Sequence, residues 1–312
     1  MKIFKKIALS VAAFMVLLLL GGYLYFDKKF TPSENTLNVS GVAQNIAIHW
    51  DSDEGNPHAA VLVPVKLKGI DRIFYMQLDS GSPSTLFYRK PLESIRGKFQ
   101  DQVKFDEEKN LISLQFSIEN MNIASKGFEL IDYGSIFNFD STEADQIIGT
   151  IGTDLLEKRI AVLDFKNGML SFLENINEEG FETFEFKKRK ILLPSEVENK
   201  KLKLLYDSGT SGYELIMNKE EWEKYRIPGG NIKKEKGNSW GNTLSVISAP
   251  AHHTIKIGHS DLKLSEVTYI EGTSKMQNFL MKSSGMQGMT GNKLFLNHKL
   301  ILDCKNEKFK VE

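Results

Sequence analysis

Two stretches of the sequence repeat each other, and this repeat limits the possible folds more than any other feature. The segment IGTDLLEKRIAVLDFKNGMLSF (residues 151–172) aligns without a gap on TGNKLFLNHKLILDCKNEKFKV (residues 290–311). In both copies a glycine is followed 12 residues later by an aspartate, and Lys-Asn follows that aspartate after one residue. A gapless match of this length indicates an internal duplication.

A second pair of matching segments lies upstream of the first pair. YMQLDSGSPSTLF (residues 75–87) corresponds to KLLYDSGTSGYELI (residues 203–216), with Asp79 and Asp207 at equivalent positions. From this aspartate to the repeated glycine there are 73 residues in the first half and 84 in the second. Two matched blocks in the same order predict a tandem duplication of one folding unit.

The unit that is duplicated is rich in β-strands. Short apolar or alternating runs, such as AVLVPVKLKG, LISLQFSI and KLKLLYD, are separated by Gly, Asn, Asp and Pro. Runs of four to eight residues with these boundaries are typical of strands. Helical patterns are few, and the best two lie at residues 90–99 and 218–227. We therefore expect a mainly β protein.

The repeat also suggests where the chain divides. We expect an N-terminal β lobe at residues 58–182 and a C-terminal β lobe at 183–312, with the boundary in the polar stretch NINEEGFETFEFKKRK. Residues 30–57 are polar and mixed, and we interpret them as a stalk or lead-in strand.

The first 29 residues have the pattern of a membrane anchor. Lysines precede an uncharged run from Ile7 to Phe26, and charges return directly after it. About 20 apolar residues span a bilayer as a helix, and basic residues ahead of the span favour a cytoplasmic N-terminus. We expect residues 1–29 to form a cytoplasmic tip and single-pass signal anchor, with the rest periplasmic or extracellular. A cleaved signal peptide is the alternative.

Charge and composition exclude several classes of function. Forty basic and forty acidic residues cancel, and basic clusters such as residues 187–190 are expected to be solvated faces, so we expect no nucleic-acid partner. Cys304 is the sole cysteine, and His252-His253 has no acidic partner at ligand spacing. We therefore expect neither an intrachain disulfide nor a metal or other cofactor.

Asp79 and Asp207 each end an apolar strand, where a buried carboxylate is costly unless it is hydrogen-bonded or neutralised. A pseudo-twofold axis between the two halves would bring the equivalent turns together. Two adjacent carboxyls cannot both ionise easily and share one proton. One can then act as a base toward water while the other donates to a carbonyl oxygen. The residues suited to holding the pair in place are Ser80, Gly81, Ser82, Ser208, Gly209 and Thr210.

The two motifs DSGS and DSGT, with TIGTDLL and MTGNKLF after them, resemble the pattern of the two-lobed, pepsin-like aspartic proteases. Each half also resembles a retropepsin-type subunit. The resemblance covers residues 59–312 and implies a bilobal acid protease fold in a bacterial, membrane-anchored form. It implies an aspartic endopeptidase that acts on peptides or proteins. Because both motifs lie in one chain, two chains need not pair, and we expect a monomer.

The resemblance also implies roles for single residues. Asp79 and Asp207 would be the catalytic pair, sharing one proton as the carboxyl pair of aspartic proteases does. Ser80 and Ser208 would hold the two turns together across the axis. Ser82 and Thr210 would form hydrogen bonds with the outer carboxylate oxygens.

The sequence departs from the family pattern in the flap, the hairpin that closes over the substrate in the first lobe. Residues 90–131 contain no tyrosine and no glycine pair, although a short flap is possible near residues 107–110. The hairpin pattern KGNSWGNTLSV in the second half is more flap-like, and we expect Trp240 to cap the cleft. The missing tyrosine also leaves an alternative, a catalytically inactive ectodomain that binds peptides or envelope material.

Overall fold

The computed structural model describes residues 22, 27–28, 31–53, 55–99, 103–106, 108–139, 146–239, 242–272 and 285–312. The chain divides into two units, Met1–Glu34 and Asn35–Glu312. Most of the expected membrane anchor lies outside the described residues. Within the described ranges, no helix combines the length and apolarity that crossing a bilayer requires.

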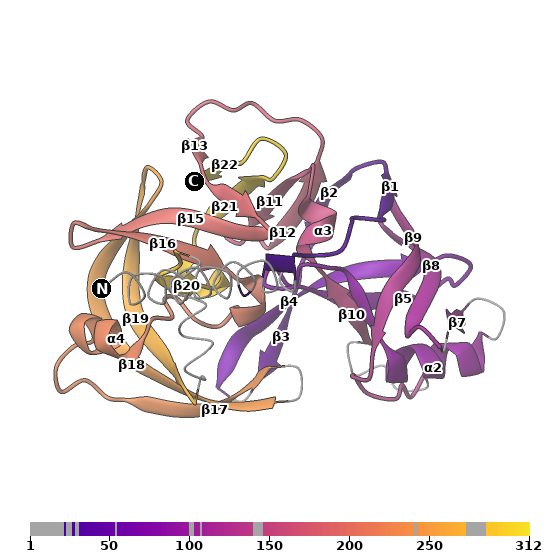
Figure 1. Ribbon diagram of the computed structural model, residues 1–312, viewed down its shortest axis with the longest axis horizontal. Helices are drawn as coiled ribbons and strands as arrows, with labels where there is room; N and C mark the ends of the chain where they lie inside the picture. The colour runs from indigo at the N-terminus through magenta and orange to yellow at the C-terminus, as the bar shows by residue number, and fades with distance from the viewer. Residues whose placement is uncertain are drawn as a thin grey trace, which may run out of the picture. The chain divides into compact units, whose positions relative to one another are not determined.

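The unit Asn35–Glu312 is mainly β, as the sequence predicts, and the described strands form three sheets (Figure 1). The first sheet comes from the N-terminal half and has the strand order β1-β9-β6-β10-β5-β4-β8-β7, with β3 paired to β4. Its strands are β1 (Asn38–Ser40), β3 (His49–Asp53), β4 (Asn56–Leu67), β5 (Ile73–Leu78), β6 (Leu86–Tyr88), β7 (Lys104–Asp106), β8 (Leu111–Ile118), β9 (Met121–Ile131) and β10 (Ile147–Ile151).

The sheet of the C-terminal half has the order β17-β18-β15-β16-β20, with β14 paired to β15 and β19 paired to β18. In Figure 1 it lies on the opposite side of the unit from the first sheet. Its strands are β14 (Glu185–Lys187), β15 (Lys190–Val197), β16 (Lys200–Tyr206), β17 (Lys233–Ser239), β18 (Asn242–Ile257), β19 (Ser260–Glu271) and β20 (Gly288–Thr290).

The third sheet joins the two halves and has the order β13-β22-β21-β11-β12-β2. Its strands are β2 (Ala43–Ala47), β11 (Ile160–Asp164), β12 (Met169–Leu173), β13 (Glu182–Thr183), β21 (Lys299–Asp303) and β22 (Lys308–Val311). The short helices are α2 (Arg89–Lys98), α3 (Thr153–Leu156), α4 (Lys219–Tyr225), η1 (Ser208–Thr210) and η2 (Asn292–Phe295). Both sequence-predicted helices are present, as α2 and α4.

The register between β11 and β21 reveals a pseudo-twofold axis. These strands are equivalent in the sequence repeat, and they pair antiparallel with Val162 opposite Ile301. The pair Ile160–Asp303 on one side is matched by Asp164–Lys299 on the other, so each strand makes the same pairing with its counterpart. An isologous contact of this kind is the signature of twofold symmetry. The predicted duplication is therefore visible in the strand pairing.

The same duplication appears beside each Asp-Ser-Gly turn. Strand β5 leads into the first turn and pairs parallel with β10, while β16 leads into the second and pairs parallel with β20. In β5 the side chains of Phe74, Met76 and Leu78 are buried, and those between them are more exposed. Burying each contributes about 1.5–3 kcal/mol. This alternation determines which face of β5 packs against the core, and it thus sets the position of Asp79 at the end of the strand.

The range 30–57, for which the sequence predicts a stalk or lead-in strand, contributes several strands to the folded unit. β1 pairs with β9, β2 pairs with β12, and β3 pairs with β4. Ala43 and Ile46 of β2 belong to the main hydrophobic core. From Asn38 onward, this range is therefore part of the folded unit rather than a linker.

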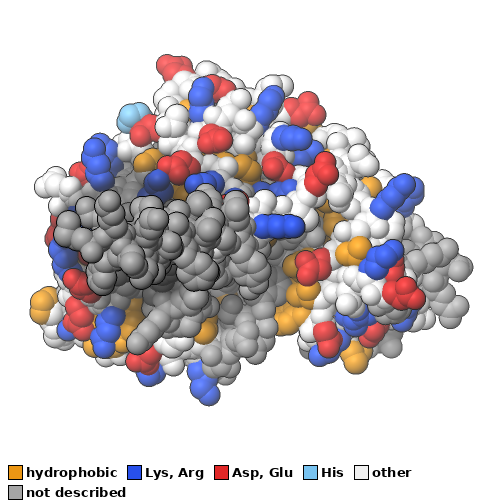
Figure 2. Space-filling view, in the orientation of Figure 1, with side chains coloured by type: hydrophobic (Ala, Val, Ile, Leu, Met, Phe, Trp, Pro, Cys, Tyr) orange, Lys and Arg blue, Asp and Glu red, His pale blue; other side chains and the backbone are white. Residues whose placement is uncertain are grey.

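Charged side chains of both signs are interspersed on the face shown in Figure 2, and neither sign gathers into one patch there. One member of the basic cluster 187–190 departs from the solvated face that the sequence predicts. Arg189 is buried, and its guanidinium contacts Glu157 and the carbonyl oxygen of Pro83. A buried guanidinium needs such partners. The contact links the C-terminal half to the segment just after the first Asp-Ser-Gly turn.

Candidate active site

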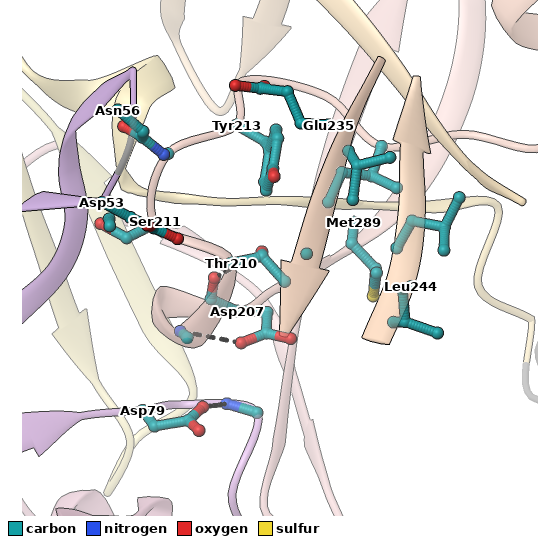
Figure 3. Close-up of a pocket in the computed structure, with 18 of the residues that line it drawn as sticks. Asp53, Asn56, Asp79, Asp207, Thr210, Ser211, Tyr213, Glu235, Leu244 and Met289 are labelled. Carbon is teal, nitrogen blue, oxygen red and sulfur yellow. Dashed lines mark hydrogen bonds between the residues drawn. The ribbon is translucent and has the colours of Figure 1, made fainter. Parts of the chain in front are cut away.

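The two Asp-Ser-Gly turns are built by matching backbone hydrogen bonds. The N–H of Asp79 donates to the carbonyl oxygen of Ile151 on β10, and the N–H of Asp207 donates to that of Thr290 on β20, both at 3.0 Å. Each strand therefore continues its parallel pairing up to the aspartate. The chain then turns, and both carboxylates face the space between the halves (Figure 3).

Two serines lock the turns to each other across the axis. The Ser208 hydroxyl donates to the carbonyl oxygen of Leu78 at 2.9 Å and accepts from the N–H of Ser80 at 2.8 Å. In return, the Ser80 hydroxyl donates to the carbonyl oxygen of Tyr206 at 2.9 Å and accepts from the N–H of Ser208 at 2.9 Å. Both serines are almost completely buried. The structure thus joins the two turns through the residues that the sequence analysis selected for this role.

Each carboxylate is held within its own turn and lies against the glycine of the other turn. Oδ1 of Asp79 accepts from the N–H of Gly81 at 2.8 Å, and Oδ1 of Asp207 accepts from the N–H of Gly209 at 2.9 Å (Figure 3). A Cβ atom on Gly81 would lie 2.6 Å from Oδ1 of Asp207, and one on Gly209 would lie 2.6 Å from Oδ1 of Asp79. Only glycine permits this close approach.

The pKa values of the two carboxyls are those of a pair that shares a proton. Burial, followed by the negative charge of Asp79, raises the pKa of Asp207 to about 7. Burial also raises the pKa of Asp79, opposed by the N–H groups of Gly81 and Ser82 and by a hydrogen bond with Asp207. That hydrogen bond raises the pKa of Asp207 and lowers that of Asp79. Both pKa values are raised by burial, so the two carboxyls titrate as a pair that retains one shared proton.

The outer hydroxyls of the turns do not have the partners that the family resemblance implies. The Ser82 hydroxyl donates to the carbonyl oxygen of Ser84 at 2.8 Å, and the Thr210 hydroxyl donates to that of Asp207 at 2.9 Å. It is the backbone N–H of Ser82, at 3.2 Å, that reaches the Asp79 carboxylate. These two hydroxyls therefore stabilise the turns rather than the outer carboxylate oxygens.

The repeated glycine segment supports the first turn from below. The N–H and hydroxyl of Thr153 both donate to the carbonyl oxygen of Ser82, at 2.9 and 3.0 Å. The buried carboxylate of Asp154 accepts from the N–H and hydroxyl of Thr85, at 2.8 and 2.7 Å. A Cβ on Gly152 would lie 2.4 Å from the backbone carbon of Ser84, so this segment packs tightly beneath the turn.

The second half fills the same place with different chemistry. Asn292 replaces Thr153 in the repeat, and its amide contacts the Ser211 hydroxyl at 2.9 Å and the Tyr206 hydroxyl at 2.6 Å. Asp164 and Asp303 of the repeat each accept hydrogen bonds from the Lys-Asn turn that follows them. They therefore stabilise these turns, and both lie apart from the lining of the cavity.

A cavity of about 830 Å³ opens over the two carboxylates. Its volume lies within the range of about 300–1,000 Å³ found for ligand sites in proteins. Both halves contribute to its walls, and Asp79, Gly81, Asp207, Gly209 and Thr210 form its floor. Apolar side chains of the second half line one wall, namely Ile216, Leu244, Val246, Ile270 and Met289.

The hairpin formed by β17 and β18 borders this cavity from the second half. Residues 234–237 of β17 line it together with Leu244 and Val246 of β18, and Figure 3 labels Glu235 and Leu244 among them. Trp240, the predicted cap, lies outside the described residues. In the first half, β7 and β8 form the corresponding hairpin, and none of their described residues lines the cavity. Among the described residues, the hairpin that lines the cavity as a flap would is therefore β17–β18 of the C-terminal half.

Two tyrosines of the first half also line the cavity, and the sequence analysis did not select them. The rings of Tyr88 and Tyr133 meet edge to face at 4.8 Å, and the Tyr88 hydroxyl lies 2.7 Å from that of Thr150. Burial, together with the charges of Tyr133 and Asp79, raises the pKa of Tyr88 to about 12. Tyr88 follows the DSGS motif by a few residues, which is the signal that could have pointed to it.

Comparison with known proteins gives one kind of match. A search of solved structures finds the crystal structure of an aspartic proteinase from Irpex lacteus, with a TM-score of 0.48 and 9% sequence identity. The match covers 87% of this chain and 97% of that chain. No protein-family model matches the sequence, and no curated protein matches it.

Proposed function

We propose that this protein is an aspartic-type endopeptidase, a pepsin-like enzyme that hydrolyses peptide bonds with water activated between Asp79 and Asp207. The observation that carries the proposal is the pair of buried carboxyls, held by matching turns at the floor of a cavity and joined by the Ser80–Ser208 interlock. A fold needs no such pair for stability, because two adjacent buried carboxyls disfavour ionisation and cost free energy.

We propose a division of roles between the two groups. Ionised Asp79 removes a proton from water as the water oxygen bonds to the carbonyl carbon of the peptide. Asp207 gives its proton to the carbonyl oxygen, which yields a tetrahedral diol. Asp79 then gives the proton it gained to the amide nitrogen, and Asp207 takes a proton from one hydroxyl of the diol as the C–N bond breaks, so that a carboxylic acid and an amine are released. The pair again holds one proton, so the cycle is balanced without a covalent intermediate.

The cavity walls favour an extended peptide as the substrate. Apolar side chains of the second half, including Leu244 and Met289, line the cavity together with two tyrosines of the first half. Apolar walls with a few converging polar groups are typical of sites that bury a ligand. We propose Trp240 as a further substrate contact, because it belongs to the sequence of the hairpin that borders the cavity.

We propose the cellular location, oligomeric state and partner of the enzyme from its sequence. The apolar run Ile7–Phe26 and its flanking lysines favour a bacterial signal anchor with the catalytic unit outside the cytoplasm. A monomer suffices, because both carboxyls come from one chain. The balance of charge favours a peptide or protein partner over nucleic acid.

The test is peptide hydrolysis by the purified full-length chain, using a diverse peptide library from pH 3 to 7, about the range in which a carboxyl pair titrates. Asp79→Asn and Asp207→Asn should each lower kcat/KM by about 10²–10⁴-fold or more while the fold survives. Asp71→Asn is the matched control, since Asp71 is exposed and pairs with Lys66. Full activity in either dyad variant would exclude the mechanism.

Pepstatin, an inhibitor of the family that the sequence resembles, adds a second readout. Hydrolysis that depends on the dyad and is inhibited by pepstatin supports the proposal. Peptide binding without hydrolysis by the wild-type chain at every pH would instead identify the inactive ectodomain.

A further inference from the structure

The tip of the β3–β4 hairpin belongs to the first half of the chain but lies against the second half. A Cβ atom on Gly212 would lie 1.5 Å from Nδ2 of Asn56, so the Asn56 amide packs directly on the Gly212 backbone. Gly212 follows the second Asp-Ser-Gly turn by a few residues. Figure 3 shows Asn56 and Asp53 of this hairpin beside Ser211 and Tyr213. The hairpin tip therefore forms part of the cavity wall at one end.

A second contact joins the same tip to the β17–β18 hairpin. A Cβ atom on Gly55 would lie 3.2 Å from Nζ of Lys233 and 3.5 Å from Oε1 of Glu235. Lys233 and Glu235 pair with each other at 2.5 Å. Gly55 has a φ of +82°, a conformation that favours glycine and permits the tight turn. The tip thus touches both elements of the second half that border this end of the cavity.

Aromatic contacts hold the arms of the hairpin in place. Trp50 on β3 meets His58 on β4 edge to face at 4.7 Å, and it stacks on Phe165 at 5.8 Å. The backbone N–H of His58 donates to Oδ1 of Asn56 at 3.1 Å. This hydrogen bond holds the Asn56 side chain in the orientation that packs on Gly212. These two ring contacts of Trp50 favour one position for the hairpin over a range of positions.

We propose that the β3–β4 hairpin closes one end of the active-site cavity and restricts the enzyme to peptide bonds near one terminus of the substrate chain. This inference rests on the proposed function. A peptide that lies extended over Asp79 and Asp207 advances about 3.3–3.6 Å per residue. On the closed side it meets Asn56 and Asp53, so only a few residues fit between the scissile bond and the end of the chain. The substrate class is therefore short peptides and the terminal segments of longer chains.

The test uses peptides that share one cleavable core and are lengthened residue by residue on one side or on the other. For the wild-type full-length chain, lengthening on one side should lower kcat/KM at least tenfold beyond a threshold, while lengthening on the other side has little effect. Mass spectrometry of the products should show a released terminal fragment of constant length. Cleavage in the middle of long peptides with no dependence on length would overturn the proposal.

Variants of the hairpin should remove the limit. Replacing residues 52–59 with Asn-Gly joins Asp51 to Ala60, which already pair in the hairpin, through a favoured two-residue turn. This variant should cleave the lengthened peptides within about threefold of the short ones. Asn56→Gly, a smaller change that keeps the hairpin, should relax the limit in part. Asn110→Gly is the control, because Asn110 lies in another hairpin turn and does not line the cavity.

Two different failures are distinguishable. If no peptide is hydrolysed in a manner that depends on Asp207, the proposed function fails. If hydrolysis depends on Asp207 but wild type and the shortened hairpin have the same length profile, the function stands and the closed end is excluded. Circular dichroism and retained cleavage of the short core peptide show that the variants fold.

Discussion

The serine interlock between the two turns offers a quantitative test of the pseudo-symmetric site. Ser208→Ala would leave the buried N–H of Ser80 and the carbonyl oxygen of Leu78 without these partners. Ser80→Ala would do the same to the N–H of Ser208 and the carbonyl oxygen of Tyr206. The two substitutions are therefore equivalent in what they remove.

The magnitude follows from these lost bonds. A buried polar group left unsatisfied costs about 1–3 kcal/mol. Each variant affects one N–H and one carbonyl, and an under-satisfied carbonyl is better tolerated. We expect Ser80→Ala and Ser208→Ala each to lower the free energy of unfolding by about 2–4 kcal/mol. Ser82→Ala, which removes one bond within a single turn, should cost about 1 kcal/mol.

The assay is chemical denaturation of the full-length chain followed by circular dichroism, with kcat/KM measured alongside. Because the interlock sets the spacing of the carboxyls, Ser80→Ala and Ser208→Ala should also lose activity, whereas Ser82→Ala should lose little. The reasoning is refuted if Ser82→Ala destabilises as much as the other two, or if either cross-axis serine costs less than about 1 kcal/mol.

Three further predictions concern the same framework. Gly209→Ala would place a methyl carbon 2.6 Å from Oδ1 of Asp79 and should lower kcat/KM about 10²-fold, whereas Gly97→Ala, with nothing within 4 Å, should leave it unchanged. Arg189→Met removes the contact to the carbonyl oxygen of Pro83 and should lower the free energy of unfolding by about 1–3 kcal/mol, measured by denaturation. Because the pKa of Asp207 is raised from 3.8 to about 7 on folding, the folded state holds a proton that the unfolded state has lost between these values. The stability of wild type relative to Asp207→Asn should therefore fall as the pH rises from 4 to 7, and a rise would contradict the shift.

The sequence predicts well that the two Asp-Ser-Gly turns meet, because each half of the duplication carries the same motif and the same flanking segments. The turns at Asp79 and Asp207 share a strand before them and a glycine segment after them, and those blocks are long enough to align. A residue that has no equivalent in the other half is not marked by any alignment between the halves. Arg189 lies within a run of basic residues that has the composition of a solvated surface, and only the fold shows that one of them is buried.

The hairpin tip at Asp53 and Asn56 illustrates a different limit. Its sequence is polar and irregular, which is typical of a loop or stalk. Its place at the cavity depends on long-range pairing of β3 with β4 and on packing against Gly212, a residue far away in the sequence. The partners of the Ser82 and Thr210 hydroxyls depend on local turn geometry in the same way, and the family pattern alone gave the wrong acceptors.

The dependence of kcat/KM on pH for the best peptide substrate tests the shared proton most directly. The bell-shaped profile of a pair that must hold one proton should fall on the alkaline side as the pH passes about 7, where the pair loses its shared proton, and fall again in acid, where the pair gains a second one. The same measurement on Asp207→Asn should give kcat/KM values lower by about 10²-fold or more at every pH. A flat profile from pH 3 to 8 in the wild type, or undiminished hydrolysis by Asp207→Asn, would contradict the account.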